Sequence, residues 1–451
     1  MRNLRRTTMA GAAGATSLVL ALTGCSSSGD GNGTKAPAKA LTQSEIDKAM
    51  DTPTTITFWS WLPNIQDQID LFEKKYPKIK VVLVNQGDAS AQYVKLRAAV
   101  KAGQGVPDVA QVGYDYLPSF TQTKSLLELT PYGADKIASD FVPGVWSQVV
   151  QNGGIYAVPQ DSGPMGTLYR TDILSKAGVD APATWADFAT AAQEVKSKTG
   201  AYITNLPGND MPQTLGFFSQ AGASLFTYDG KTTVGINVDN DVTQKVVAYW
   251  QDLIQKDLVS TDPDFTDAWY QGLSRGKYAT WLTAAWGPTF LAGSAKNTSG
   301  AWRAATLPQW SAGQNVSGNW GGSSDAVMAA TKNPIPAYEL AKFINNDPSS
   351  TIELANKQSL YPTTISTLSS PAFTDAKSDF YGGQQVNKFF ADVSSTVPQN
   401  QKYVPFEDYV NSSYNDTLGK AIADHGDLKA ALSAWQQQLV TYAKQQGFSV
   451  K

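Results

Sequence analysis

The sequence predicts an α/β fold built as more than one domain, and three observations support this prediction. From residue 54 onward, segments rich in β-branched and aromatic residues alternate with segments of helical spacing. A second run of the same kind begins after residue 160. The chain has 451 residues, which is more than one hydrophobic core usually organises. Alternating strands and helices imply parallel strand pairs with right-handed crossovers.

The first α/β unit is expected to contain three strands and two helices. The strands are predicted at 54–61 (TTITFWSW), 79–84 and 108–112, and the helices at 65–76 and 90–102. The first of these helices should end before Pro77, because the residue before a proline disfavours helical geometry.

Sheets of this kind bind ligands beyond the carboxyl ends of their strands. Polar and aromatic side chains cluster at those predicted ends, and they form one coherent candidate rim: Trp59, Trp61, Gln86, Asp88, Tyr114 and Asp115.

The second run begins with two predicted strands, at 155–159 and 165–169, that the segment QDSGP joins. Further strands are expected at 202–205, 277–282, 301–307 and 326–330, with helices at 185–198, 242–256 and 336–345. From there the chain is predicted to be mostly helical to residue 451.

Composition excludes several classes of function. The chain has one cysteine and one histidine, His425, so zinc sites of His and Cys and histidine-dependent triads are not expected. The net charge of −3 comes without basic clusters, which argues against nucleic acid as a partner. No nucleotide fingerprint lies between a predicted strand and helix, and we expect no cofactor and no metal.

The N-terminal region has the features of an export signal. Arg2, Arg5 and Arg6 precede a short apolar stretch that ends in the string LTGC at residues 22–25. LTGC resembles a bacterial lipobox, so residues 1–24 are predicted to be a cleaved signal and Cys25 a lipidated first residue. An ordinary cleaved signal is the alternative, and the arginine pair also resembles a twin-arginine signal. Residues 25–41 are small and polar and predict a flexible tether.

Several strings spread over the mature chain together resemble one family. They are ITFWSW, PDVAQVGYDYLPSF, GGIYAVPQDSGPMGTLYR, GKYATWLTAAWGPTF and GNWGGSSDAVMAATKNPIPAYELAKFI. In order and spacing the chain resembles the carbohydrate-binding extracellular solute-binding lipoproteins of ATP-binding-cassette importers, the branch of maltose-binding protein.

The resemblance implies a two-lobed, periplasmic-binding-protein-like (type II) fold with a hinge and an interlobe cleft. Chain crossings are expected near Asp161, Pro308 and Asp347. Lobe 1 would then comprise 42–160 plus 309–347, and lobe 2 would comprise 161–308 plus 348–451. The implied partners are a carbohydrate, the membrane permease of an importer and a lipid anchor, with the protein acting as a monomer outside the cytoplasm.

A sugar needs flat aromatic side chains for its C–H faces and carboxylates or amides for its hydroxyls. The candidates that meet this need come from both predicted lobes: Trp59, Trp61, Asp88, Asp115, Asp161, Trp286, Trp320, Tyr361 and Glu407.

Each candidate has an ordinary structural alternative. Asp161 could cap a turn, and Asp88 and Asp115 could cap helices. Trp286 and Trp320 could be core side chains, and packing would equally suit aromatics in the helical C-terminal region.

Other functions stay open at this point. A glycoside hydrolase would need two carboxylates roughly 5 to 9 Å apart, and Asp161 with Glu407 or Asp115 are the available pairs. A polyamine would suit an acidic aromatic cleft through cation–π contact. An adhesin or structural lipoprotein would show no closure on a ligand.

Overall fold

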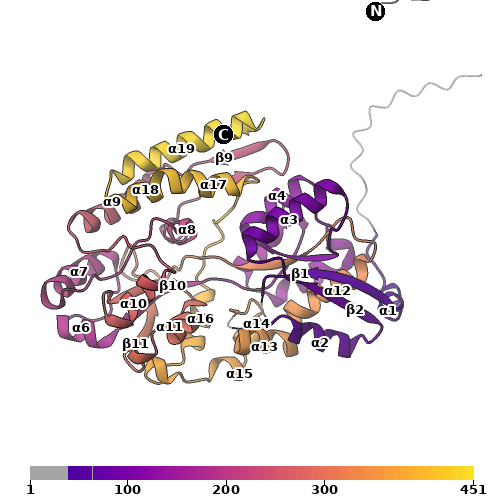
Figure 1. Ribbon diagram of the computed structural model, residues 1–451, viewed down its shortest axis with the longest axis horizontal. Coiled ribbons are helices and arrows are strands. Elements are labelled where there is room, and N and C mark those ends of the chain that lie inside the picture. Colours follow the sequence, from indigo (N-terminus) through magenta and orange to yellow (C-terminus); the bar gives the residue numbers. More distant parts are fainter. Residues whose placement is uncertain (1–38, 63, 359) are drawn as a thin grey trace, which may run out of the picture. The chain divides into compact units, whose positions relative to one another are not determined.

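A five-stranded mixed sheet organises the first lobe (Figure 1). The computed structural model describes residues 39–62, 64–358 and 360–451. In sheet order the strands are β2 (Ile79–Val84), β1 (Thr54–Trp59), β3 (Val109–Gly113), β12 (Ser323–Val327) and β6 (Val158–Pro159). β1 pairs in parallel with β2 and β3, as predicted, whereas β12 lies antiparallel between β3 and β6. The sheet therefore combines strands from three distant parts of the chain.

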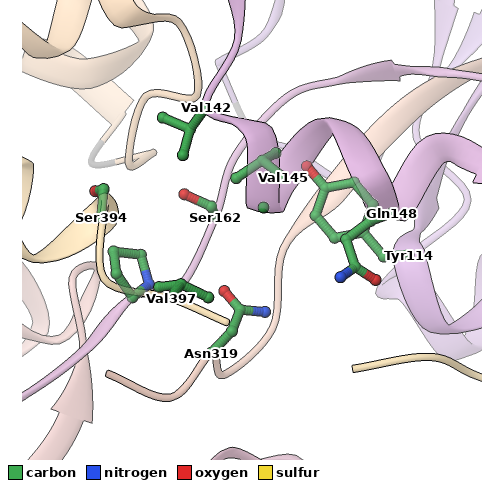
Figure 2. Close-up of a pocket in the computed structure, with 10 residues that line it drawn as sticks. Tyr114, Val142, Val145, Gln148, Ser162, Asn319, Ser394 and Val397 are labelled. Carbon is green, nitrogen blue, oxygen red and sulfur yellow. The ribbon is translucent and has the colours of Figure 1, made fainter. Parts of the chain in front are cut away.

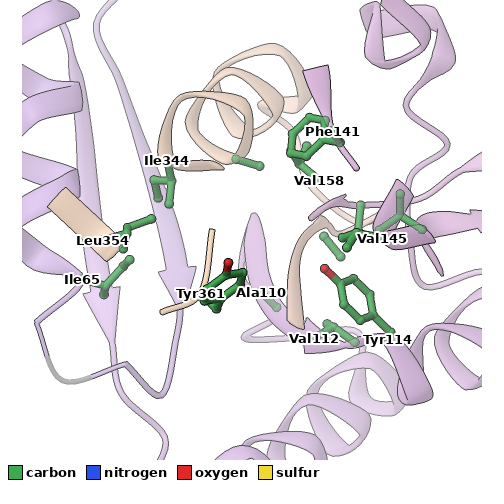
Figure 3. Close-up of a cluster of buried hydrophobic side chains, with 14 of the residues drawn as sticks. Ile65, Ala110, Val112, Tyr114, Phe141, Val145, Val158, Ile344, Leu354 and Tyr361 are labelled. Carbon is green, nitrogen blue, oxygen red and sulfur yellow. The ribbon is translucent and has the colours of Figure 1, made fainter. Parts of the chain in front are cut away.

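Helices α2 (Gln66–Lys75) and α12 (Pro334–Asn346) pack against each other and against this sheet (Figure 1). Ile69 and Phe72 of α2 are fully buried, as expected for the apolar side of an amphipathic helix. Figure 3 shows part of this core, a cluster of buried side chains that includes Ala110 of β3 and Ile344 of α12.

The remaining elements of this lobe connect the strands or cover the sheet. They are α1 (Gln43–Met50), α3 (Ala89–Ala102), η1 (Tyr114–Tyr116), α4 (Leu117–Gln122), η2 (Thr130–Tyr132), η3 (Ala134–Asp140), α5 (Pro143–Val149), β4 (Val150–Gln151) and β5 (Gly154–Ile155).

The second lobe is built around an antiparallel sheet in the order β10 (Thr280–Ala284), β7 (Met165–Arg170) and β11 (Trp302–Thr306). A smaller sheet joins β13 (Ser449–Val450), β9 (Thr233–Ile236) and β8 (Phe226–Tyr228). The surrounding helices are α6 (Thr171–Ala177), α7 (Trp185–Thr199), α8 (Met211–Gln220), α9 (Asp241–Gln255), α10 (Asp267–Arg275), α11 (Gly287–Ser294) and η4 (Lys296–Thr298).

The chain after β12 is mostly helical, as predicted. Its elements after α12 are α13 (Pro348–Gln358), α14 (Ile365–Leu368), α15 (Pro371–Thr374), η5 (Asp379–Tyr381), α16 (Val386–Ser394), α17 (Glu407–Tyr414), the π-helical turn η6 (Asn415–Gly419), α18 (Lys420–Ala423) and α19 (Leu428–Gln445). α19 packs against α9 and α17, which places the C-terminal helices on the second lobe (Figure 1).

Several sequence-based expectations about strands were wrong. Residues 155–159 do not form one strand, because β5 and β6 belong to different sheets. Residues 202–205 form no strand and make only isolated bridges, from Tyr202 to Tyr278 and from Asn205 to Ser260. The strand expected at 326–330 begins earlier, at Ser323, because its first residues pair with β3 and β6. Parallel pairing also fails in the larger sheet of the second lobe, where β7 pairs with antiparallel neighbours on both sides.

Three chain segments meet where the lobes join. The N–H of Trp320 donates to the carbonyl of Gly163 over 2.8 Å, and the N–H of Ser162 donates to the carbonyl of Tyr361 over 3.2 Å. The segments at 162–163, 320 and 361 are therefore hydrogen-bonded to one another where the lobes join. The crossings expected near Asp161, Pro308 and Asp347, and the lobe boundaries that follow from them, stay predictions.

No helix among the described residues is both long enough and apolar enough to cross a membrane. The expected signal, Cys25 and the tether up to residue 38 lie outside the described residues, so these features stay predictions.

Candidate functional site

A cavity of about 280 Å³ opens between residues of the first lobe and residues of the second. On the first lobe it is lined by Trp61, Ala89, Ser90, Tyr93, Gly113, Asp115, Tyr116, Gly321 and Gly322. On the second lobe it is lined by Met211, Pro212, Leu215, Gln401, Tyr403, Glu407 and Asn411. None of these residues is a lysine, arginine or histidine, so the lining is aromatic, amide-bearing and acidic.

The first-lobe side of the cavity lies at the carboxyl ends of β1 and β3, as the sheet topology predicts. Trp61 follows β1 and meets the ring of Tyr93 edge-on, with centroids 5.9 Å apart. Tyr93 in turn stacks on Tyr116 at 4.1 Å. The Tyr93 hydroxyl accepts a 2.8 Å bond from the N–H of Gly113, which anchors the aromatic group to the end of β3.

Asp115 and Glu407 bring carboxyl groups from the two lobes into the same cavity. Asp115 lies in η1, and burial raises its pKa to about 6. Glu407 lies in the first turn of α17 and is 2% exposed. Burial raises the pKa of Glu407 well above its usual range, and the nearby Asp115 and Asp408 raise it further. The site therefore concentrates acidic groups, and the Glu407 carboxyl among them is almost wholly removed from solvent.

Asp408 links the lobes directly beside this cavity. Its carboxylate accepts a 2.9 Å hydrogen bond from the Tyr116 hydroxyl and pairs with the Arg97 guanidinium at 2.8 Å. Arg97 also lies over the Tyr116 ring, 5.5 Å from its centroid. Helix α3, turn η1 and helix α17 are thus held together in this conformation.

The chain next to β12 approaches the first lobe closely. Gly322 has a φ of +117°, a backbone conformation that side chains rarely allow. A Cβ at Gly322 would lie 2.5 Å from the Tyr114 ring and 3.0 Å from the carbonyl of Asp161. A glycine is needed here to keep both the turn and the room beside the cavity.

Trp286 and Trp320 belong to an aromatic cluster adjacent to Gly321. Their rings meet at 4.8 Å, and the Trp286 indole N–H donates to the carbonyl of Trp320 over 3.1 Å. Trp320 is 4% exposed and Trp286 is half-buried, and neither lines the cavity. Phe265 packs against both rings and is 42% exposed, with a φ of +56° that is unusual for a bulky residue.

Of the predicted site residues, the structure brings Trp61, Asp115 and Glu407 together in the cavity. It does not place Trp59, Asp88 or Tyr361 there. Trp59 is 7% exposed within the core, and Asp88 is an exposed cap whose carboxylate accepts from the N–H of Ala91.

Tyr361 also lies in the core. It is 4% exposed and packs edge-on against Phe373 and Phe390. Figure 3 shows it in the same cluster of buried side chains as Ala110. The Tyr361 ring therefore packs in the core beside the segments that join the two lobes.

The Asp161 carboxylate is hydrogen-bonded to Ser323 at the start of β12. Its Oδ1 accepts from the N–H of Ser323 at 2.8 Å and from the Ser323 hydroxyl at 2.5 Å. Burial raises the pKa of Asp161, and the two bonds from Ser323 oppose that shift. This arrangement matches the turn-capping alternative, because the carboxylate fastens its own segment of the chain to the start of β12.

A second, much smaller cavity lies beside the segments that join the lobes (Figure 2). Its volume is about 10 Å³, enough for one water molecule at most. Figure 2 shows Ser162, Asn319 and Tyr114 around it, and Asn319 Oδ1 accepts a 3.1 Å bond from the N–H of Gly163. The space is too small for a sugar.

Most of the second-lobe lining was not predicted from the sequence: Met211, Pro212, Leu215, Gln401, Tyr403 and Asn411. The motif Asp-Met-Pro at 210–212 signals a helix start, and the Asp210 carboxylate does accept from the N–H of Gln213. That signal could have identified α8, but not its contact with the first lobe. Among the described residues, no group of His, Cys, Asp and Glu is arranged to hold a metal ion.

Two α/β lobes, several chain crossings and a polar aromatic cavity between the lobes define a two-lobed binding protein. The chain belongs to the bacterial extracellular solute-binding proteins, whose family model matches residues 58–349. The carbohydrate-importer resemblance noted in the sequence is thereby confirmed at the level of the family and the fold.

Proteins of known sequence and structure agree with this assignment. An arabinooligosaccharide-binding protein of Bacillus subtilis (strain 168) is 27% identical over 64% of this chain and 69% of its own. A lactose-binding protein of Rhizobium radiobacter is 26% identical over 76% of this chain and 82% of its own.

Two solved structures are similar over nearly their whole length. A transporter-associated binding protein from B. animalis subsp. lactis Bl-04, solved with β-1,6-galactobiose, has 31% identity and a TM-score of 0.75, covering 88% of this chain and 99% of its own. The galacto-N-biose-/lacto-N-biose I-binding protein of Bifidobacterium longum has 27% identity and a TM-score of 0.77, covering 88% and 98%. All four relatives are named as binding proteins.

Proposed function

We propose that this protein is the extracytoplasmic receptor of an ATP-binding-cassette importer and that it binds a sugar or oligosaccharide. The observation that carries the proposal is the 280 Å³ cavity between the lobes, which is lined by aromatic rings, amides and carboxyls without a single basic side chain. Rings suit the C–H faces of a sugar, and the amides and carboxyls suit its hydroxyls. The relatives are named for arabinooligosaccharide and lactose, and these names favour a sugar over a polyamine.

In this proposal Trp61 and Tyr116 provide apolar faces from the first lobe, and Glu407 and Asn411 provide polar groups from the second. A ligand that contacts both sides favours the conformation in which the lobes are close together. The permease would then recognise that conformation. Trp286 and Trp320 support the neighbouring wall at Gly321.

We further propose that the lipid anchor at Cys25 keeps the protein at the outer face of the cell membrane and that it works as a monomer. Labelling cells with a fatty-acid analogue tests the anchor: the wild-type protein should be labelled, and Cys25→Ser should remove the label. Label that persists in Cys25→Ser would overturn the anchor without affecting the sugar site.

The sugar function is tested by a thermal-shift screen with arabinooligosaccharides, lactose, β-1,6-galactobiose and lacto-N-biose. A ligand at 100-fold its dissociation constant adds about 2.7 kcal/mol of stability. At least one sugar should raise the melting temperature, and Trp61→Ala should reduce that shift. If no neutral sugar raised the melting temperature and spermidine clearly did, the ligand would be a polyamine and the sugar-binding function would be refuted.

Hydrolysis is the competing activity, because Asp115 and Glu407 place two carboxyl groups in one cavity. A time course with each bound sugar, followed by chromatography, separates the two functions. We expect stoichiometric binding and unchanged sugar. Turnover of the sugar would refute the receptor function in favour of a hydrolase.

A further inference from the structure

Glu407 is a buried carboxyl group whose oxygen atoms lack a hydrogen-bond partner among the described residues. The residue is 2% exposed, and neither Oε1 nor Oε2 has a hydrogen-bond partner among the described atoms. Glu407 is also one of the residues that line the interlobe cavity. Buried polar groups in proteins are nearly always hydrogen-bonded, and an unpaired one costs free energy. A ligand group at this position would supply the missing partner.

The ionisable groups that act on Glu407 are acids and phenols. Asp115 of η1 and Asp408 of α17 raise the pKa of Glu407, in addition to its burial. The phenols of Tyr116 and Tyr403 lie close enough for Glu407 to raise their pKa values. Arg97 lies over the Tyr116 ring, but its guanidinium is already paired with Asp408 at 2.8 Å.

The same end of the cavity also offers aromatic faces. Tyr116 and Tyr403 line it together with Asp115 and Glu407. A cation beside tyrosine rings is attracted by their electron-rich faces. Two carboxyls and two phenols around one space therefore favour a positively charged group over a neutral one.

We infer that this end of the cavity is a subsite for a protonated amine, so the ligand is an oligosaccharide that carries a free amino group. This inference rests on the proposed function, because it names the kind of sugar that the same site binds. An ammonium group has three donors, enough to satisfy Glu407 and Asp115 together. A hydroxyl has one donor and brings no charge to balance the carboxylates.

The test compares sugars that differ only in the substituent at C2, on one unit in the first series and on both units in the second. Lactose carries a hydroxyl at C2 of its glucose unit, galactosyl-β-1,4-glucosamine carries an amine there, and N-acetyllactosamine carries an acetamide. Cellobiose, chitobiose with free amines and N,N′-diacetylchitobiose form a second series. Dissociation constants are measured by titration calorimetry at pH 7 with the wild-type protein.

We expect the amine member of at least one series to bind tenfold or more tightly than its hydroxyl member. Glu407→Gln should reduce that ratio at least fivefold, and Asp115→Asn should reduce it as a second variant. Glu194→Gln is the matched control, because Glu194 pairs with Lys198 on α7 and does not line the cavity. Circular dichroism verifies that each variant is folded.

The pH dependence gives an independent readout. Because burial raises the pKa of Asp115 to about 6, the amine preference should shrink as the pH falls below 6 and the carboxyl is neutralised. Equal or tighter binding of the hydroxyl members in both series would overturn the amine subsite and leave the receptor intact. Binding of no member of either series, while another sugar of the thermal-shift screen binds, would overturn the amine subsite alone. Binding of none of these sugars would overturn the proposed function as well.

Discussion

Asp325 places a carboxyl group in the middle of the first-lobe sheet, where its ionisation should oppose folding. The side chain is fully buried on β12. Its Oδ2 accepts from Gln160 Nε2 at 3.0 Å and from Asn345 Nδ2 at 2.8 Å, whereas Oδ1 has no partner among the described atoms. Burial raises the pKa of Asp325 to about 7, and the charge of Asp161 adds to the shift.

The direction of the effect on stability follows from linkage. A carboxyl whose folded-state pKa is raised contributes stability that is fully present below its unfolded pKa of 3.8 and is lost as the pH rises through 7. Each pH unit of difference is worth about 1.4 kcal/mol. Between pH 5 and pH 7 the wild-type protein should therefore lose about 2 kcal/mol through this one group.

Asp325→Asn removes the ionisation and keeps the shape. The amide oxygen can accept from Gln160 and Asn345 as Oδ2 does now, and the amide nitrogen replaces the unpaired Oδ1. Relative to the wild-type protein, the variant should gain about 3 kcal/mol of unfolding free energy on going from pH 5 to pH 8.

Urea unfolding at pH 5 and pH 8, followed by tryptophan fluorescence, measures this difference. The matched control is Asp180→Asn, which makes the same substitution at an exposed position outside the first-lobe sheet. If the gap in stability between Asp325→Asn and the wild-type protein were the same at both pH values, the reasoning from burial would be refuted.

Two further predictions contrast pairs of similar substitutions. Trp61→Ala should weaken sugar binding at least about tenfold in calorimetry and cost about 1 kcal/mol of stability through the lost contact with Tyr93. Trp59→Ala should cost about 3 to 5 kcal/mol of stability because its ring is in the core. If Trp59→Ala weakened binding and Trp61→Ala cost the stability, the assignment of Trp61 to the site and Trp59 to the core would be wrong. Gly163→Ala should destabilise the protein strongly in thermal unfolding, because its Cβ would collide with the Trp320 carbonyl. Gly293→Ala, at an exposed position of α11, meets nothing within 4 Å and should stabilise slightly, so equal melting temperatures for the two alanine variants would contradict the collision.

Some of the site could be predicted because it depends on local pattern and simple topology. The apolar and aromatic residues of 54–61 identify a strand, and its end places Trp61 at the rim of the sheet. Asp115 follows the strand predicted at 108–112 in the same way. Parallel strands bring their carboxyl ends to one edge, so strand order alone could assign these two residues, far apart in the chain, to one site.

The second-lobe side of the cavity could not be predicted in this way. Gln401 and Tyr403 lie in a loop, and Asn411 lies on α17, with no periodicity that indicates contact with the first lobe. Asp161 looks like a ligand-binding carboxylate in the sequence, yet its Oδ1 is occupied by Ser323. Which partner a polar side chain meets depends on segments more than a hundred residues away.

The sequence by itself determined the α/β character, the strands that start the first lobe and the absence of basic residues among the candidate site residues. These properties follow from residue type and short-range spacing, which do not depend on how distant segments pack. Only the tertiary structure decided that β12 enters the first sheet antiparallel, that Tyr361 packs in the core and that Asp115 and Glu407 share one cavity. Each of these depends on long-range contacts, whose geometry is set by the packing of the whole fold.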